Sequence, residues 1–340
     1  MLHKLFSNKR SQNKVNKNSL LAAVGNTPLV RLNRHSKILG TNVYAKLEFF
    51  NPGLSAKDRI IAHIIEKAEE AGKLKPGGTI IDATSGNTGM AMAMLSRARG
   101  YDCVLTVADK ASKEKINSLK SLGAQVVLCP AAVKPDDPRS YYQQAITLSN
   151  EIEGAFYTNQ NFNYDNVEAH YLSTGPEIWN QLDGKITHFV AAVGTGGTIS
   201  GTGKFLKEQN ENVEIIGVDA YGSVLKKYHE TGIYDISITH PYKMEGVGKS
   251  IIPGNVKFDT IDRFVKVGDL KSALRARKMA QLEGVWGGHS SGAVLEALFK
   301  TKESFKPTDN VVILLSDHGS KYLSTIYSDE WVEEKLYSKP

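Results

Sequence analysis

A lysine stands where the sequence predicts the first turn of a helix, a position that an ordinary charged lysine does not favour. Beyond Lys57, apolar residues recur at helical spacing until Gly72. Ser55 and Asp58, three positions apart, predict a capping box at this helix start. The helix dipole and burial would both lower the pKa of the Lys57 amine, making it a nucleophile toward a carbonyl. An exposed lysine in a polar turn is the alternative that this segment alone leaves open.

A second loop has the groups of an anion site. The run Thr84-Ser-Gly-Asn-Thr-Gly89 follows a predicted strand and opens a predicted helix. It offers backbone N–H groups at a helix N-terminus, together with the side chains of Thr84, Ser85, Asn87 and Thr88. These groups fit an anion the size of a carboxylate or a phosphate. A simple capping loop is the alternative.

A third loop, Gly194-Thr-Gly-Gly-Thr198, also follows a buried apolar run and opens a helix. A dinucleotide fingerprint would require glycine where the chain has Ile199, and the nucleotide P-loop pattern does not match either. We therefore interpret the loop as a compact phosphate cradle, built from the N–H groups of Gly194, Gly196 and Gly197 and the hydroxyls of Thr195 and Thr198.

A fourth segment, Gly287-Gly-His-Ser-Ser-Gly-Ala293, places Ser290 at a helix entrance, where an N-cap is the simplest interpretation. The four segments together offer an amine nucleophile, a carboxylate site, a phosphate cradle and a hydroxyl. A cofactor that is both an aldehyde and a phosphate ester, and that handles amino acids, would use all of them. Pyridoxal 5′-phosphate is such a cofactor.

From residue 43 onward, apolar strand-like runs alternate with helical patterns and short links, which predicts mostly parallel sheets in an α/β fold. The pattern restarts near residue 188, which suggests two α/β domains. Ligands of such folds bind at the carboxyl ends of the strands. The loops described above lie at these strand ends or shortly after them. The expected strands are 79–82, 103–107, 125–129, 156–158, 188–193, 214–218 and 310–315, and the expected helices are 90–99, 113–122, 140–153, one ending near 208, 270–283 and 291–300.

Composition narrows the class of protein. With 41% hydrophobic and 23% charged residues the chain is typical of globular proteins, and no apolar run approaches the roughly 20 residues that span a bilayer. The net charge of +6 lies largely in an Asn/Lys/Ser-rich tail, residues 1–18, which we expect to be disordered. Nucleic-acid binding would require basic residues interleaved with aromatic ones on a folded face, and the sequence shows no such pattern. Cys103 and Cys129 are expected to be buried free thiols, and no His/Cys spacing suggests a metal.

The motifs, taken in order from Val24-Gly-Asn-Thr-Pro-Leu-Val30 to Tyr322-Leu-Ser324, resemble the β-family (fold type II) of pyridoxal-phosphate enzymes, and within it cystathionine β-synthase and cysteine synthase (O-acetylserine sulfhydrylase). The resemblance implies a tryptophan synthase β-like fold with the active site between two domains. It implies a smaller domain of residues 48–165, a larger one of 19–47 plus 166–340, and a homodimer. The N-terminus has no apolar core of the secretory kind, so we expect a cytoplasmic protein.

The resemblance also implies a role for each motif residue. Lys57 would hold the cofactor and move the substrate's α-proton, Asn87 would bond the pyridoxal 3′-oxygen, and Ser290 would meet the pyridine nitrogen. The substrate carboxylate would be held by Thr84, Ser85, Thr88 and Gln160, and the cofactor phosphate by Gly194, Thr195, Gly196, Gly197 and Thr198. The implied reaction is β-replacement on serine or O-acetylserine through an aminoacrylate, with homocysteine or sulfide as the nucleophile.

The choice within the family stays open between cystathionine β-synthase, cysteine synthase and a β-replacement with another nucleophile that gives a lanthionine or a diaminopropionate-type product. Three departures from the family pattern bear on it: Asn161 after Gln160, Leu54 before Ser55, and a longer Ser316–Ser320 loop. A hydrolase built on Ser55 and Lys57, or a non-catalytic binding protein, are the alternatives from other classes.

Overall fold

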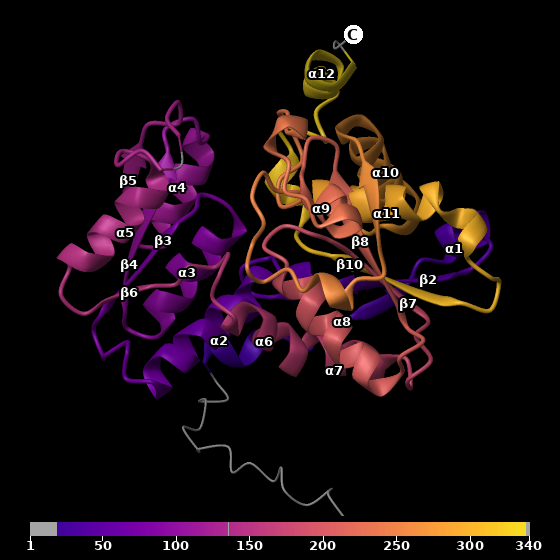
Figure 1. Cartoon of the computed structure of the whole chain (residues 1–340), viewed down its shortest axis with the longest axis horizontal. Helices are drawn as coiled ribbons and strands as arrows, with labels where there is room; N and C mark the ends of the chain where they lie inside the picture. Colours follow the sequence, from indigo (N-terminus) through magenta and orange to yellow (C-terminus); the bar gives the residue numbers. More distant parts are fainter. Residues whose placement is uncertain (1–18, 135, 338–340) are drawn as a thin grey trace, which may run out of the picture.

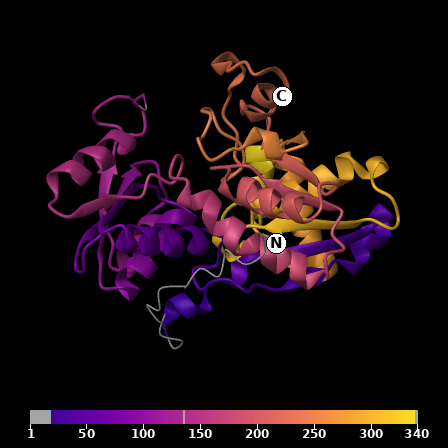
Figure 2. The ribbon, with the colours of Figure 1, turned by 60° about the horizontal axis from the view of Figure 1, so that its bottom comes forward.

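The computed structural model describes residues 19–134 and 136–337 of the 340, so the expected disordered tail lies outside the described residues. The chain forms two α/β units side by side, each built on its own sheet (Figure 1). The same two bodies remain distinct when the molecule is turned by 60° (Figure 2).

The large unit contains a six-stranded sheet in the order β1-β2-β10-β7-β8-β9. Only β1 runs antiparallel, pairing with β2, and the other neighbours are parallel. Its strands are β1 (Leu29–Arg31), β2 (Asn42–Leu47), β7 (His188–Ala192), β8 (Glu214–Ala220), β9 (Arg263–Val267) and β10 (Asn310–Leu315).

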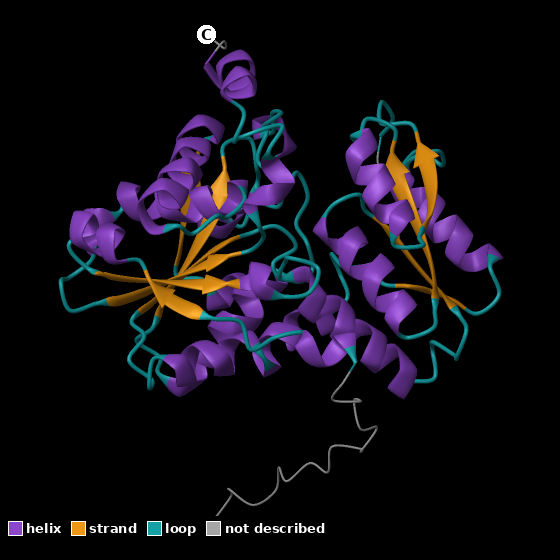
Figure 3. Cartoon of the chain, turned by 180° about the vertical axis from the view of Figure 1, so that it is seen from behind, coloured by secondary structure: helices purple, strands orange, loops and turns teal. Residues whose placement is uncertain are grey.

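The small unit contains a four-stranded, wholly parallel sheet in the order β5-β4-β3-β6. Its strands are β3 (Thr79–Ala83), β4 (Asp102–Ala108), β5 (Gln125–Cys129) and β6 (Ala155–Tyr157). Because the crossovers between parallel strands are helices, helices cover the faces of both sheets (Figure 3).

The helices fall into groups by the sheet that they cover. Helices α2 (Lys57–Glu70), α3 (Asn87–Ala98), α4 (Lys113–Ser121) and α5 (Tyr141–Glu151) accompany the small sheet. The large sheet is accompanied by α1 (Asn33–Leu39), α7 (Thr174–Gln181), α8 (Gly197–Gln209), α9 (Leu225–Thr231), α10 (Asp269–Glu283) and α11 (His289–Lys300). Helix α6 (Asp165–Leu172) packs on both α2 and α8 and so joins the units, while α12 (Asp329–Val332) lies near the C-terminus.

Both faces of each sheet are buried, which explains the apolar strands that do not alternate with polar residues. On β10, Val311 and Ile313 belong to one core cluster, while Val312 and Leu314 belong to another on the opposite face. The small sheet is likewise buried on two faces. Each Å² of apolar surface removed from water contributes about 25 cal/mol to folding, so strands buried on both faces contribute strongly to stability. The predicted parallel α/β fold is confirmed.

Three strands and a capping motif were not predicted correctly. Strands β1, β2 and β9 carry polar residues that break their apolar runs, so no strand was expected there. The capping box is wrong: α2 has no side-chain cap at Ala56, the residue before its first turn. Asp58 instead accepts from Gly53 N at 2.5 Å, and Ser55 Oγ accepts only from Lys57 N at 3.3 Å.

A buried ion network joins α2 to the large unit. Arg59 donates to Glu48 at 2.6 Å and to Glu177 of α7 at 2.6 Å, and Lys46 of β2 also reaches Glu177 at 2.6 Å. Burial alone would raise the pKa of Glu177, but its hydrogen bonds and charge interactions with Arg59 outweigh burial and hold the pKa at about 2. The network therefore keeps its charges and fixes the start of α2, which carries Lys57.

Replacing Arg59 with methionine is expected to lower the free energy of unfolding by about 3–5 kcal/mol, because buried Glu48 would lose its cation. Urea unfolding of the two proteins, followed by circular dichroism, measures the change. Arg97→Met is the matched control: Arg97 is 58% exposed and its pair with Asp102 spans 3.6 Å, so its loss should cost less than about 1 kcal/mol. Equal midpoints for Arg59→Met and Arg97→Met would contradict the structural role of the network.

No helix within the described residues is both long and apolar enough to cross a membrane.

Candidate active site

Lys57 is the first residue of α2, as predicted, and its side chain is largely enclosed. Removal from water, the largest influence, lowers the pKa of its amine, and the nearby charge of Lys321 lowers it further. The carboxylates of Asp317 and Glu48 act in the opposite direction without restoring the ordinary pKa. The amine is thus biased toward the neutral form that attacks a carbonyl.

The loop before Lys57 is held in an exact path by backbone contacts. Ala56 N donates to Ser316 O at 2.9 Å, and Ser55 forms a bridge with Asp317. Leu54 has φ of +58°, the left-handed region, which costs a residue with a Cβ about 1–2 kcal/mol relative to its ordinary conformation. This position favours glycine on backbone grounds, so Leu54 has a strained backbone three residues before the candidate nucleophile.

Asn87 is the first residue of α3, and two charged side chains of the large unit hold its amide. Its Nδ2 donates to Asp317 Oδ2 at 2.7 Å, and its Oδ1 accepts from Lys321 Nζ at 2.7 Å. Lys321 also donates to Gly53 O at 3.0 Å. Because Asp317 uses one of the two Nδ2 protons, the second stays available for an oxygen of a ligand.

Asp317 contacts several segments of the candidate site, and sequence reasoning did not single it out. It is buried, and besides Asn87 it accepts from the Tyr322 hydroxyl at 2.7 Å, while its backbone carbonyl accepts from Gly288 N at 3.0 Å. Burial raises the pKa of Asp317, against the opposing influence of Lys321 and its hydrogen bonds. An acidic residue two positions after buried strand β10 was the available signal, since the carboxyl ends of parallel strands bear ligands.

The predicted carboxylate loop is tied to the predicted phosphate loop by a chain of hydrogen bonds. Thr88 Oγ1 donates to Gln160 Oε1 at 2.6 Å. Asn166 Nδ2 then links Gln160 O at 2.9 Å to Thr195 Oγ1 at 3.0 Å. Asn255 also donates to Gln160 O, at 2.8 Å. Thr84 and Ser85 lie half-buried in the same loop.

The segment Gly194–Thr198, called the phosphate loop below, has the geometry of a tight backbone cradle. Helix α8 begins at Gly197, and Gly196 has φ of +93°. A Cβ at Gly196 would lie 2.4 Å from Val256, and one at Gly197 would lie 1.9 Å from Asn166, so only glycine fits either position. Backbone N–H groups at the start of a helix fit a phosphate.

The phosphate loop is supported by a histidine that the sequence did not mark. His170 Nε2 lies 3.0 Å from Thr198 Oγ1, and its Nδ1 lies 2.8 Å from Thr174 Oγ1. Burial lowers the pKa of His170 to about 3, so the ring is neutral. It orients the Thr198 hydroxyl without adding charge.

Ser290 is the second residue of α11 and is 4% exposed. Its loop does not follow a strand but pairs with the segment after β10, through the bridge between Gly287 and His318. A Cβ at Gly288 would lie 2.1 Å from Asp317 Oδ1, so this backbone is held against the same carboxylate that holds Asn87. The tertiary structure thus brings together Lys57, Asn87, the phosphate loop and the entrance to α11.

Comparison with known proteins identifies the family. A model of pyridoxal-phosphate dependent enzymes matches residues 20–317. The chain belongs to that family. The residues described above suit the cofactor: an amine of lowered pKa, a glycine cradle for its phosphate, and a buried hydroxyl at a helix entrance. The cofactor, when bound, supplies the electron withdrawal that makes an amino acid's α-proton acidic.

Two similar proteins and one similar solved structure are enzymes named as synthases. The chain is 40% identical to cystathionine β-synthase of Apis mellifera over 94% of its length, and spans 63% of that protein. It is 40% identical to cysteine synthase of Staphylococcus aureus, covering 90% of this chain and 95% of that one. The structure of an O-ureido-L-serine synthase superposes with a TM-score of 0.84 at 30% identity, covering 95% of this chain and 97% of the other.

Among the described residues, no group of three His, Cys, Asp or Glu side chains could hold a metal ion. Both cysteines are free and buried, and burial raises the pKa of Cys103 to about 12 and that of Cys129 above its ordinary value. Neither thiol therefore supplies a thiolate to the site.

Proposed function

We propose that this enzyme catalyses β-replacement on L-serine or O-acetyl-L-serine, adding a thiol such as homocysteine or sulfide. The observation that carries the proposal is that the amine of Lys57, with its lowered pKa, interacts with Asp317 and Lys321, the two side chains that hold the Asn87 amide in place. Lys57 would accept the substrate's α-proton and return it after the thiol has added.

The other roles follow from position. Thr84, Ser85, Thr88 and Gln160 would bind the substrate carboxylate, and the phosphate loop would bind the cofactor phosphate, with Thr195 and Thr198 oriented by Asn166 and His170. Ser290 would meet the pyridine nitrogen. A neutral hydroxyl there, in place of a carboxylate, would not hold a proton on that nitrogen, and this favours loss of the β-substituent over transamination-type chemistry.

Cysteine synthase activity is the second candidate, supported by similarity to the Staphylococcus aureus enzyme at equal identity. A β-replacement with another nucleophile is the third. The similarity to an O-ureido-L-serine synthase, whose name denotes a serine derivative, supports keeping it. We expect Asn161, which follows Gln160, and Leu54, three positions before Lys57, to bear on this specificity.

Substrate tests separate these candidates. Purified enzyme mixed with serine or O-acetylserine should show a change in the visible spectrum of the bound cofactor within one turnover. We then expect homocysteine to reverse the change faster than sulfide does at equal concentration, and mass spectrometry to find cystathionine. Faster reversal by sulfide would instead support cysteine synthase, and no spectral change with either amino acid would contradict β-replacement altogether.

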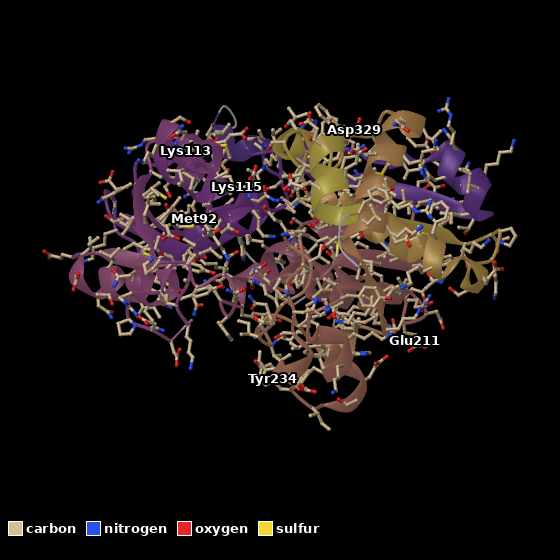
Figure 4. All side chains as sticks on the ribbon, turned by 90° about the horizontal axis from the view of Figure 1, so that it is seen from above. Met92, Lys113, Lys115, Glu211, Tyr234 and Asp329 are labelled. Atoms are coloured by element: carbon tan, nitrogen blue, oxygen red, sulfur yellow. The ribbon has the colours of Figure 1, made fainter. Side chains whose placement is uncertain are left out.

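We further propose a cytoplasmic homodimer, on the resemblance to the family and on the two free thiols, which suit a reducing compartment. The domain boundaries proposed from the sequence, residues 48–165 and 19–47 plus 166–340, are supported by the division of the strands between two sheets. Besides α6, the ion pair of Lys115 with Glu245, at 2.5 Å, links the units, and Figure 4 shows Lys115 on the side of α4 nearer the large unit.

A further inference from the structure

Lys249 is a cation at the ligand-binding edge of the large sheet. Its backbone is fixed on both sides, since its N donates to Ser223 Oγ at 2.9 Å and its carbonyl accepts from Val224 N at 2.9 Å. The preceding Gly248 N donates at 2.7 Å to the carbonyl of Val193, the last residue before the phosphate loop. The side chain therefore starts from a rigid point beside the candidate active site.

The side chain of Lys249 reaches toward the small unit. Its ammonium interacts electrostatically with Lys57 of α2 and with Asp82 of β3. Within the described residues no hydrogen bond joins Lys249 to Asp82, which accepts from Ala83 N at 2.6 Å and from the Thr158 hydroxyl. Lys249 thus faces the space between the units, close enough to Lys57 for the two amines to affect each other.

Lys249 has no counterion in the part of the chain that the structure describes, and its side chain is half-buried. Two other enclosed lysines have one: Lys46 lies 2.6 Å from Glu177, and Lys266 lies 2.8 Å from Asp219. An ammonium group removed from water without a partner is costly. Burial and the Lys57 charge accordingly lower the pKa of Lys249, although Asp82 opposes them. Such a cation suits an anionic ligand.

Three anions could meet it, and two already have groups to bind them. The cofactor phosphate has the phosphate loop, and the carboxylate of the first substrate has the Thr84–Thr88 loop with Gln160. An amino-acid nucleophile would bring a third anion, its own carboxylate. Lys321 is already engaged, since it donates to Gly53 O and to Asn87 Oδ1, and Lys57 is assigned to the cofactor, which leaves Lys249 for this carboxylate.

We propose that Lys249 binds the carboxylate of an amino-acid nucleophile, so that the enzyme prefers thiols bearing a carboxylate, such as homocysteine or cysteine, over hydrosulfide. The inference rests on the proposed β-replacement. In that reaction the Cβ–O bond of serine breaks and the oxygen leaves as water. The thiol gives up its proton as its sulfur bonds to Cβ, and Cα loses and regains one proton. Lys249 takes no part in these bond changes; it positions the incoming thiol.

The test compares Lys249→Met and Lys249→Arg with the unchanged enzyme in three measurements. The first is the affinity of the apoprotein for pyridoxal phosphate. The second is the rate of the spectral change caused by serine. The third is the rate at which homocysteine, sulfide or 2-mercaptoethanol reverses that change. Lys243→Met is the matched control, because Lys243 is an exposed lysine of the same segment.

With Lys249→Met we expect homocysteine to react more slowly by about tenfold or more, the value of a charge-assisted hydrogen bond. Reaction with sulfide and 2-mercaptoethanol should not change, and Lys249→Arg should retain most of the homocysteine rate. Equal slowing of all three thiols would overturn the proposal, as would weaker cofactor binding or a slower first step. If the unchanged enzyme shows no spectral change with serine or O-acetylserine, the proposed function itself fails.

Discussion

Lys57→Ala protein is expected to be colourless, whereas the unchanged enzyme is yellow with bound cofactor. The physical reason is that Lys57 carries an amine of lowered pKa that interacts with Asp317 and Lys321, and alanine removes the amine that we assign to the aldehyde carbon. Turnover should fall by at least about a thousandfold, because the same amine moves the α-proton.

Visible absorption during titration with pyridoxal phosphate measures the first effect. Borohydride reduction followed by peptide mass spectrometry should find the cofactor on the peptide that contains residue 57. Because burial lowers the pKa of Lys57, the rate of cofactor attachment should level off at a lower pH than for an exposed lysine. Lys113→Ala, at an exposed position of α4, is the control and should remain yellow. A yellow and active Lys57→Ala protein would remove the basis of the assignment.

Ser290→Asp should leave the protein able to bind cofactor but slow loss of the β-substituent by about a hundredfold or more, a size typical for changed electrostatics at a reacting group. A carboxylate at the second residue of α11 would hold a proton on the pyridine nitrogen. Electrons drawn into the ring would then be retained instead of expelling the β-substituent.

The rate of the spectral change with O-acetylserine measures this effect. Ser290→Ala serves as the control, since it removes the hydroxyl without adding charge, and we expect it to retain more activity than Ser290→Asp. Thermal unfolding of both variants shows whether a carboxylate at this buried position prevents folding. Near-normal elimination by a folded Ser290→Asp protein would refute the role assigned to Ser290.

Local sequence was sufficient for the features that depend on neighbours along the chain. The strand Gln125–Cys129 has the predicted bounds, because a short apolar run ending before a loop leaves little choice. Helix α2 begins at Lys57 because apolar residues at helical spacing start there. The glycines of the phosphate loop were meaningful in isolation, since their backbone tolerates contacts that no Cβ allows.

Local sequence failed where a partner lies far along the chain. Ser55 and Asp58 have the spacing of a capping box, yet Asp58 accepts a hydrogen bond from Gly53 N instead. The loop before α2 is held by its backbone bridge to the segment after β10. Strand β9 was not predicted because Arg263 and Lys266 interrupt its apolar residues. The strand forms by pairing with β8. Tertiary pairing overrides such weak local preferences.

The groups that we propose for the site could therefore be named from the order of residues, as an amine, an amide, hydroxyls and glycines at helix starts. Which charges surround them was decided only by folding. Asp317 and Lys321 lie 230 and 234 positions from Asn87, and they hold its amide because the segments that follow β10 and β3 meet in the folded chain. The absence of a counterion for Lys249 among the described residues likewise becomes visible only in the folded chain. Electrostatic interactions depend on distance in space and on removal from water, and neither quantity is written in the spacing of residues.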